Sequence, residues 1–327
     1  MGTLLTTDWR MSISRAIRSS AELRRYVGLP PEATPDAESD FPVFVPREYA
    51  DRIRHGDPDD PLLRQVLADS REDVPVDGFG GDAVGDLAAM RPGGVVHKYD
   101  GRVLLMTSAA CGVHCRYCFR REFPYAEHSD RGNRWDAALT TIGDDESIRE
   151  VILSGGDPLT VDDPPLVELL KRLEAIEHVR RIRFHTRMPT VIPSRVTTGL
   201  CQAIERSTRT VVVVLHVNHF RELGGDVDRA INALRRTGAM MFNQSVLLRG
   251  VNDDVATLAD LCEGLVDRGV TPYYLHSLDR AAGVAHFDAP RNRGVELIEQ
   301  LRRRLPGYAV PRHVVELAGE PSKTPLG

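Results

Sequence analysis

Two alternating hydrophobic patterns run along this chain from residue 97 onward. Short apolar runs rich in valine, isoleucine and leucine predict buried strands, at residues 103–107, 150–153, 181–185, 210–216, 240–246 and 271–276. Apolar positions at helical spacing predict helices between them, at residues 135–142, 166–173, 196–204, 228–236 and 256–266, with a last helix over 293–305. This alternation predicts an α/β fold with a parallel sheet, either an open doubly wound sheet or a barrel.

The pattern before residue 97 predicts a mostly helical segment. Apolar residues recur at helical spacing up to residue 26, and the Ser19–Ser20 pair interrupts them. Three prolines between residues 30 and 35 predict a loop, and residues 57–68 begin with the proline and acids typical of a helix start. We therefore expect a mostly helical N-terminal extension (1–95), an α/β core (96–290) and a final helix with its tail (291–327).

Composition and charge narrow the classes of function. The 327 residues include 42 basic and 47 acidic side chains, and no basic run resembles a nucleic-acid footprint. We find no apolar stretch long enough to cross a bilayer and no secretory signal at the N-terminus. These observations predict no nucleic-acid or membrane partner. The cysteines do not form a disulfide framework, so we expect a cytoplasmic protein.

The sequence SAACGVHCRYCFRR (108–121) carries the most specific chemical signal. It spaces Cys111, Cys115 and Cys118 as C-x₃-C-x₂-C. Three thiolates this close can bind one face of a 4Fe–4S cluster, and the fourth iron is then open to another ligand. A structural zinc site would need a fourth ligand, for which His114 is the local candidate, and a redox pair would not need a third cysteine. Cys201 and Cys262 lie in apolar helical patterns and are interpreted as buried side chains.

Other candidate residues follow the ends of the predicted strands. In a parallel sheet, ligands bind at the carboxyl ends of the strands. Two adjacent glycines allow close approach to the backbone, and an acid beside them can pair with an ammonium group. The residues at these positions are Gly155, Gly156 and Asp157 after the second strand, His216 on the fourth, Gln244 on the fifth and Asp279 after the sixth.

A family resemblance extends over nearly the whole chain. The motif C-x₃-C-x-aromatic-C, with Tyr117, resembles that of radical S-adenosylmethionine (SAM) enzymes. The continuation CRYCFRREFPYAE resembles the lysine 2,3-aminomutases, especially their short forms, which make β-lysine for translation elongation factor P. REYADRIRHGDPDDPLLRQVL, NQSVLL and PSKTP extend this likeness. It implies a partial (β/α)₆ TIM-like barrel with an N-terminal helical extension and a short C-terminal segment that supplies a lysine for pyridoxal phosphate (PLP).

The resemblance also implies three cofactors and a role for each candidate residue. The three cysteines would bind the 4Fe–4S cluster, and Lys323 would form a Schiff base with PLP. Arg120 would grip the substrate carboxylate, while Asp279 and Glu316 would hold a distant ammonium group; because two buried carboxylates need a cation between them, a cationic substrate is expected. The remaining cofactor-binding residues would be Tyr117, Gly155, Gly156, Asp157, His216 and Gln244.

The implied reaction is an isomerisation of L-lysine to β-lysine. Reductive cleavage of SAM would give a 5′-deoxyadenosyl radical, and the amino group would migrate from Cα to Cβ on PLP. A flavodoxin- or ferredoxin-type reductant and a functional link to an elongation-factor-P lysyl ligase are the implied partners.

Two other functions remain open at this stage. One is an aminomutase that acts on free lysine, arginine or ornithine in secondary metabolism. The other is a non-catalytic iron–sulfur or regulatory protein. The long aminomutases continue into a zinc-binding tail that this chain lacks, so zinc is not expected and the oligomeric state is left open.

Overall fold

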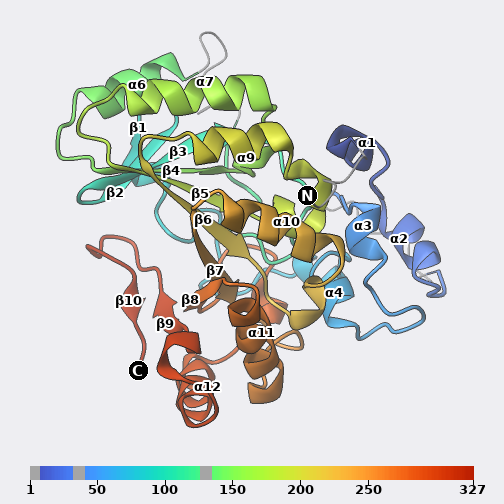
Figure 1. Cartoon of the computed structure of the whole chain (residues 1–327). Helices are drawn as coiled ribbons and strands as arrows, with labels where there is room; N and C mark the ends of the chain where they lie inside the picture. Colours follow the sequence, from blue (N-terminus) through green and yellow to red (C-terminus); the bar gives the residue numbers. More distant parts are fainter. Residues whose placement is uncertain (1–7, 32–40, 126–134) are drawn as a thin grey trace.

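A computed structural model of the chain describes residues 8–31, 41–125 and 135–327 (Figure 1). Within these residues, ten strands form one sheet in which neighbours along the chain are also neighbours in space. Strands β3 to β9 are parallel, and antiparallel strands flank them at both edges. The strands are β1 (Met90–Arg91), β2 (Val95–Tyr99), β3 (Arg102–Ser108), β4 (Glu150–Gly155), β5 (Arg181–Thr186), β6 (Thr210–His216), β7 (Met240–Val246), β8 (Thr271–His276), β9 (Arg312–Val315) and β10 (Thr324–Pro325).

The strand order decides between the two kinds of parallel sheet. A doubly wound sheet reverses its strand order at a switch point, whereas a barrel adds each strand beside the previous one. The order here is sequential throughout, and the first and last strands are not paired with each other. The described residues therefore form a partial barrel, and the predicted fold class is confirmed.

Helices cover the outer face of this sheet (Figure 1). In α10 the buried residues Val227, Ala230, Ile231 and Leu234 recur every three or four positions, so one stripe of the helix faces the strands. Gly238, just past its end, has a φ of 83°, a conformation that glycine adopts without a steric penalty. The segment 108–121 with the three clustered cysteines is called the cysteine loop from here on. The described helices that follow it are α6 (Asp136–Gly143), α7 (Asp163–Glu174), α8 (Met188–Val191), α9 (Thr198–Glu205), α10 (Asp226–Arg236), α11 (Val255–Asp267) and α12 (Arg291–Arg304).

The N-terminal extension packs against the barrel through short helices, and turns and loops make up much of the rest of its described residues. Ser19 interrupts the helical pattern and caps α2, where its hydroxyl accepts a hydrogen bond from Glu22 N at 3.1 Å. Asp60 caps α4 in the same way, at the proline-containing helix start. The helices are α1 (Trp9–Ser14), α2 (Ser20–Tyr26), α3 (Arg47–Ala50) and α4 (Pro61–Arg64), which lie together on one side of the molecule (Figure 1). Pro35 of the predicted loop lies outside the described residues.

Short 3₁₀ helices connect many of these elements. Asp157 caps η3, and Glu222 ends η5, so both of these acids lie in the connections that follow strands β4 and β6. The segments are η1 (Ser70–Asp73), η2 (Leu87–Ala89), η3 (Pro158–Thr160), η4 (Pro193–Arg195), η5 (Phe220–Glu222), η6 (Ala285–Phe287) and η7 (Gly307–Ala309).

The extension and the barrel share one hydrophobic core. Trp9, Tyr49 and Leu62 belong to the same buried cluster as Val103 and Val151 of the sheet. Strand β2 begins at Val95, where the extension was expected to end, and β9 and β10 continue the sheet beyond residue 291. The division into three segments stays a prediction, but its outer segments both contribute strands to the barrel.

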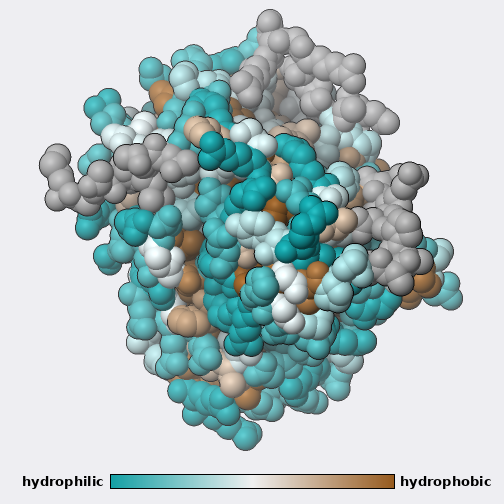
Figure 2. Space-filling model, turned by 90° about the vertical axis from the view of Figure 1, so that its right-hand side faces the viewer, coloured by the Kyte–Doolittle hydropathy of each residue, from teal (hydrophilic) through white to brown (hydrophobic). Residues whose placement is uncertain are grey.

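The surface over the N-terminal side is mainly hydrophilic, with apolar residues in small separate groups (Figure 2). None of the helices in the described ranges has the length and apolar character needed to span a bilayer.

Candidate active site

The cysteine loop begins where β3 ends and is tied to the surrounding chain by backbone hydrogen bonds. His114 N donates to Phe44 O and Arg116 N to Gln65 O, both at 2.9 Å, so the N-terminal extension supports the loop from one side. Asp157 N donates to Ala110 O at 2.8 Å, which attaches the loop to the end of β4. The loop that presents the three cysteines is therefore fixed by two distant parts of the chain.

The three cysteines are close enough to influence one another. Burial raises the pKa of the Cys111 thiol, and negative charge on Cys118 and Cys115 raises it further. Burial and Cys115 likewise raise the pKa of Cys118 to about 11. Three mutually repelling thiolates in a buried loop are stabilised by positive charge, which the irons of a cluster supply.

Within the described residues, no group of three or more histidine, cysteine or acidic side chains is arranged around a single metal ion. A 4Fe–4S cluster does not require such convergence, since each cysteine binds a different iron. Three cysteines that are spaced along one loop, each free to bind its own iron, therefore fit a 4Fe–4S cluster.

Arg187, directly after β5, lies beside the cysteine loop. Its Nη1 donates to Cys115 Sγ at 2.9 Å and to the Tyr117 hydroxyl at 2.7 Å. Its Nη2 donates to Gln65 Oε1 and Glu222 Oε2, each at 2.8 Å. Burial alone would lower the pKa of Arg187, but the surrounding anionic groups outweigh it and raise this pKa well above the usual value. A permanently charged guanidinium therefore contacts one of the predicted cluster ligands.

The carboxylate of Asp157 is occupied by hydrogen bonds from its own chain. It accepts from Leu159 N at 2.9 Å, from Arg187 N at 2.7 Å, from Met188 N at 3.2 Å and from the Thr186 hydroxyl at 2.8 Å. Burial raises the pKa of Asp157 to about 6 against the opposing effect of these donors. The carboxylate thus fastens the end of β5 to the end of β4, and its predicted contact with the ammonium group of SAM stays a prediction.

Gly155 and Gly156 are required by the approach of the cysteine loop. A Cβ on Gly155 would lie 2.3 Å from Ser108 O, and one on Gly156 would lie 2.3 Å from Ala110 O. Gly155 also has a φ of 111°, which side chains rarely permit. The sequence predicts close approach of a ligand here; the structure shows close approach of the chain itself, which positions the loop before any ligand binds.

His216 and Gln244 are brought together inside the barrel. They are register partners on the parallel strands β6 and β7, and His216 Nε2 lies 2.7 Å from Gln244 Nε2. Burial lowers the pKa of His216 to about 3, so the imidazole is neutral near pH 7 and accepts the amide hydrogen. These two residues form one polar unit at the ends of neighbouring strands.

A chain of alternating charges links the remaining predicted site residues. Arg120 Nε donates to Asp86 Oδ2 at 2.7 Å, and Lys98 Nζ lies 2.5 Å from Asp86 Oδ1. Lys98 Nζ also donates to Glu316 Oε1 at 2.9 Å, and Glu316 Oε2 accepts from Lys323 Nζ. Burial would raise the pKa of Glu316, but Lys323 and Lys98 hold it at about 2. Arg120, Glu316 and Lys323 therefore belong to one electrostatic network.

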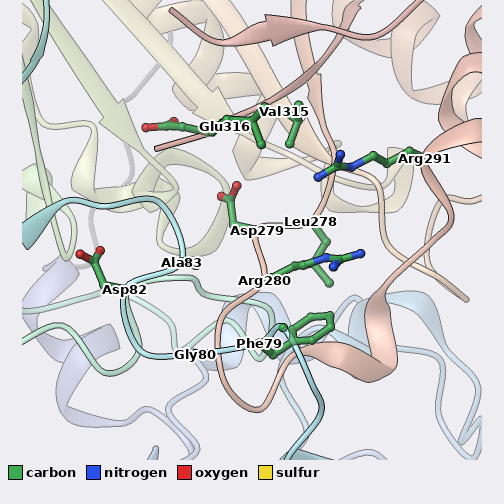
Figure 3. Close-up of a pocket in the computed structure, with 12 residues that line it drawn as sticks. Phe79, Gly80, Asp82, Ala83, Leu278, Asp279, Arg280, Arg291, Val315 and Glu316 are labelled. Carbon is green, nitrogen blue, oxygen red and sulfur yellow. The ribbon is translucent and has the colours of Figure 1, made fainter. Parts of the chain in front are cut away.

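Asp279 has no direct ion pair with this network among the described residues, and it lies in a pocket of about 460 Å³ that Glu316 also lines. Figure 3 shows both acids in this pocket and Arg280 beside the ring of Phe79. Asp279 Oδ1 is buried and has no hydrogen-bond partner among the described residues, and burial raises the pKa of this carboxyl to about 7. A buried acid without a partner is stabilised by a cationic ligand.

Comparisons with known proteins identify the family. A family model described as a 4Fe-4S single cluster domain matches residues 100–187. L-lysine 2,3-aminomutase of Escherichia coli (strain K12) is 43% identical, over 98% of this chain and 94% of that protein. The chain belongs to the L-lysine 2,3-aminomutase family. The enzyme of the same name from Clostridium subterminale is 34% identical, over 98% of this chain and 77% of that protein.

Among solved structures, a radical SAM methyltransferase from Sphaerobacter thermophilus aligns with a TM-score of 0.47 and 18% identity. The alignment covers 67% of this chain and 68% of that chain.

Membership in the L-lysine 2,3-aminomutase family makes the protein an isomerase that uses a 4Fe–4S cluster, SAM and PLP, as predicted. The residues present fit these groups. The cysteine loop offers three thiols beside a guanidinium, and Lys323 offers a partly buried amine beside Glu316. Nε2 of His185 and Nε2 of His276 are buried without partners in the described parts of the chain, so polar atoms are available to a bound cofactor.

Several residues of this aminomutase site were missed at the sequence level. Asp86 and Lys98 connect Arg120 to Glu316, and Gln65 and Glu222 hold Arg187. Arg187 follows the third predicted strand, where ligand-binding residues are expected, but its position alone indicates no role. The others are isolated polar residues in helical or loop patterns, and their partners are far away in the sequence.

Proposed function

We propose that this chain converts L-lysine to β-lysine. Membership in the L-lysine 2,3-aminomutase family supports the reaction, and the unpartnered carboxylate of Asp279 supports the cationic substrate. Asp279 and Glu316 line one pocket, so a side-chain ammonium bound there replaces the missing partner of Asp279. An acidic side chain placed beside Asp279 and Glu316 would be repelled by both carboxylates.

The chain's own residues bind and orient this substrate. When bound, the cluster and SAM supply the radical that abstracts hydrogen, and PLP carries the migrating amino group. Cys111, Cys115 and Cys118 bind the cluster, and Lys323 anchors PLP. Arg120 grips the substrate carboxylate, because Asp86 fixes its guanidinium through Nε and leaves the Nη nitrogens for a bidentate contact.

The SAM contacts are assigned to residues around the strand ends. Tyr117 lies beside Arg187, and His216 and Gln244 provide polar atoms from β6 and β7. Gly155 and Gly156 let the cysteine loop pack closely against the end of β4. Asp157 fixes the loops around this site, and its predicted contact with the ammonium group of SAM would replace one of the donors that now hold the carboxylate. These contacts are part of the proposal.

The wider setting is also part of the proposal. We infer a cytoplasmic enzyme that receives electrons from a flavodoxin- or ferredoxin-type protein and provides β-lysine for modification of elongation factor P. Its likeness to short aminomutases supports the last point. A neighbouring gene for an elongation-factor-P lysyl ligase would favour this use over an aminomutase of secondary metabolism.

Anaerobic incubation of the reconstituted protein with SAM, PLP, dithionite and one amino acid at a time tests the proposal. We expect β-lysine from lysine and no product from glutamate. Conversion of arginine or ornithine but not lysine would contradict the substrate, and SAM cleavage without any amino acid product would favour a different radical reaction. A cluster without SAM cleavage would point to a non-catalytic iron–sulfur protein.

A further inference from the structure

We propose that Arg187 is a positioning residue that raises the reduction potential of the cluster bound at Cys115. This inference rests on the proposed function of the cysteine loop. Arg187 lies 72 residues from Cys115 in the sequence, yet its Nη1 is 2.9 Å from the sulfur. A cation that donates a hydrogen bond to a cluster sulfur stabilises the reduced cluster, which carries one more negative charge.

The guanidinium is held in this place from three directions. Glu222 Oε2 and Gln65 Oε1 accept from Nη2, and the Tyr117 hydroxyl lies 2.7 Å from Nη1. The Tyr49 hydroxyl is a weaker neighbour, 3.4 Å from Nη2. Arg187 itself is buried, with 5% of its surface exposed. Such a side chain cannot turn away from the sulfur without leaving Glu222 unpaired.

Glu222 is equally fixed. Its Oε1 accepts from Asn218 N at 3.0 Å, from His219 N at 3.1 Å and from Gln65 Nε2 at 3.2 Å. The carboxylate is fully buried and neutralises Arg187, so the arginine–glutamate pair acts as a dipole with its positive end toward Cys115. This arrangement costs little reorganisation when an electron arrives, because its charges are already in place.

A purely structural role for Arg187 predicts a different outcome from an electrostatic one. Loss of a buried brace would reduce cluster content or protein stability. Loss of a cationic hydrogen bond to sulfur would instead leave a cluster that is harder to reduce. The two are separated by measuring the midpoint potential of the assembled cluster, which depends on hydrogen bonds to its sulfur atoms.

The test compares Arg187→Met, Arg187→Lys and the double variant Arg187→Met/Glu222→Gln in redox titrations followed by electron paramagnetic resonance. In the double variant, glutamine retains an acceptor for Asn218 N and leaves no unpaired buried charge. The double variant therefore provides the measurement if Arg187→Met fails to fold. We expect a more negative midpoint potential in Arg187→Met and in the double variant. Arg187→Lys should fall between these and the original protein, because lysine keeps the charge but not the forked geometry.

Arg116→Met provides the matched control. Arg116 is a fully buried arginine of the same loop, and it donates to Glu72 Oε1 and to Phe41 O, both at 2.8 Å. Its replacement should leave the midpoint potential near that of the original protein. A second readout uses the reductant: SAM cleavage by Arg187→Met should recover when dithionite is replaced by a stronger reductant such as Ti(III) citrate.

An unchanged potential in the Arg187 variants, or an equal shift in Arg116→Met, would overturn the inference. Failure of the original protein to bind a 4Fe–4S cluster would instead reject the proposed function. The two failures are therefore distinguishable.

Discussion

Lys98 Nζ lies 2.9 Å from Glu316 Oε1, although 218 residues separate the two in the sequence. Glu316 therefore has two cationic partners, because its other oxygen accepts from Lys323. The acid stays paired when Lys323 is engaged elsewhere. Lys323 can thus form a covalent bond to a cofactor without leaving an isolated buried charge.

Replacement of Lys323 by alanine tests this arrangement. We expect loss of PLP absorbance and of amino-acid turnover, with normal cluster content, because Glu316 remains paired with Lys98 and the cluster has separate ligands. Borohydride reduction followed by mass spectrometry should locate PLP on Lys323 in the original protein. Lys171→Ala, on the exposed surface of α7, is the control; PLP attached to a different lysine would contradict the assignment.

Replacement of Cys111 by alanine should abolish both the 4Fe–4S absorbance and SAM cleavage. PLP loading should persist, since Lys323 lies on a different part of the chain. Cys201→Ala is the matched control, because Cys201 lies in α9, away from the cysteine loop in sequence. Iron analysis and visible spectra of the two variants provide the measurement, and a complete SAM-responsive cluster in Cys111→Ala would refute this ligand.

Asp279→Asn should weaken the use of lysine. The lost interaction is a hydrogen bond between charged groups, worth about 1.5–3 kcal/mol, so kcat/KM should fall by roughly one to two powers of ten. Part of the cleaved SAM should then yield no β-lysine, because the β-carbon is less well placed. Steady-state rates with lysine check this; unchanged kcat and KM in both Asp279→Asn and Glu316→Gln would reject the cationic pocket.

The raised pKa of Asp279 also predicts how activity and stability depend on pH. Its carboxyl has a pKa of about 7 because it is buried, so the ionised form that binds an ammonium group is lost as the pH falls below that value. We expect kcat/KM for lysine to decline toward pH 6, and this part of the decline to be absent in Asp279→Asn.

The free energy of unfolding depends on pH in the opposite direction. The folded protein binds the extra proton of Asp279 between about pH 4 and 7, so this group's contribution to stability decreases as the pH rises through that range. Urea unfolding of the protein without ligands should show a smaller loss of stability over this range in Asp279→Asn. Identical pH profiles would show that Asp279 ionises normally.

Asp86→Asn should damage both binding and stability. Asp86 is buried between Arg120 and Lys98, and removal of one member of a buried ion pair typically costs about 3–5 kcal/mol. Arg120 would lose the acceptor that orients it, so the KM for lysine should also rise. Urea unfolding and substrate kinetics measure the two effects, and Asp77→Asn, at an exposed position of the N-terminal extension, serves as the control.

The sequence predicted most of the fold because the barrel strands have simple, strong patterns. Strand β6 carries five consecutive buried apolar residues, and α10 has an uninterrupted apolar stripe. The edge strands of the barrel were harder to predict from the sequence. Strands β1 and β10 have two residues each, too few to show a hydrophobic period. Strand β9 has four residues and was interpreted as part of the tail.

The candidate site was predictable where a local motif carries the chemistry, as in the cysteine loop. It was not predictable where a residue works through a distant partner. Nothing near Asp86 indicates that Arg120, 34 residues away, is its partner. Asp157 shows the same limit, since its local sequence gives no sign that it accepts hydrogen bonds from Arg187 N and Met188 N.

The contacts of Gln65 limit how far this enzyme can be made smaller. Its backbone oxygen accepts a hydrogen bond from Arg116 N, and its side-chain oxygen accepts hydrogen bonds from Arg187 Nη2 and Asn218 Nδ2. A chain shortened to the barrel alone would leave these buried donors without acceptors, at about 1–3 kcal/mol each. The extension and the barrel are therefore not interchangeable modules, and a minimal catalyst must keep Gln65 at the end of α4 or replace its acceptors.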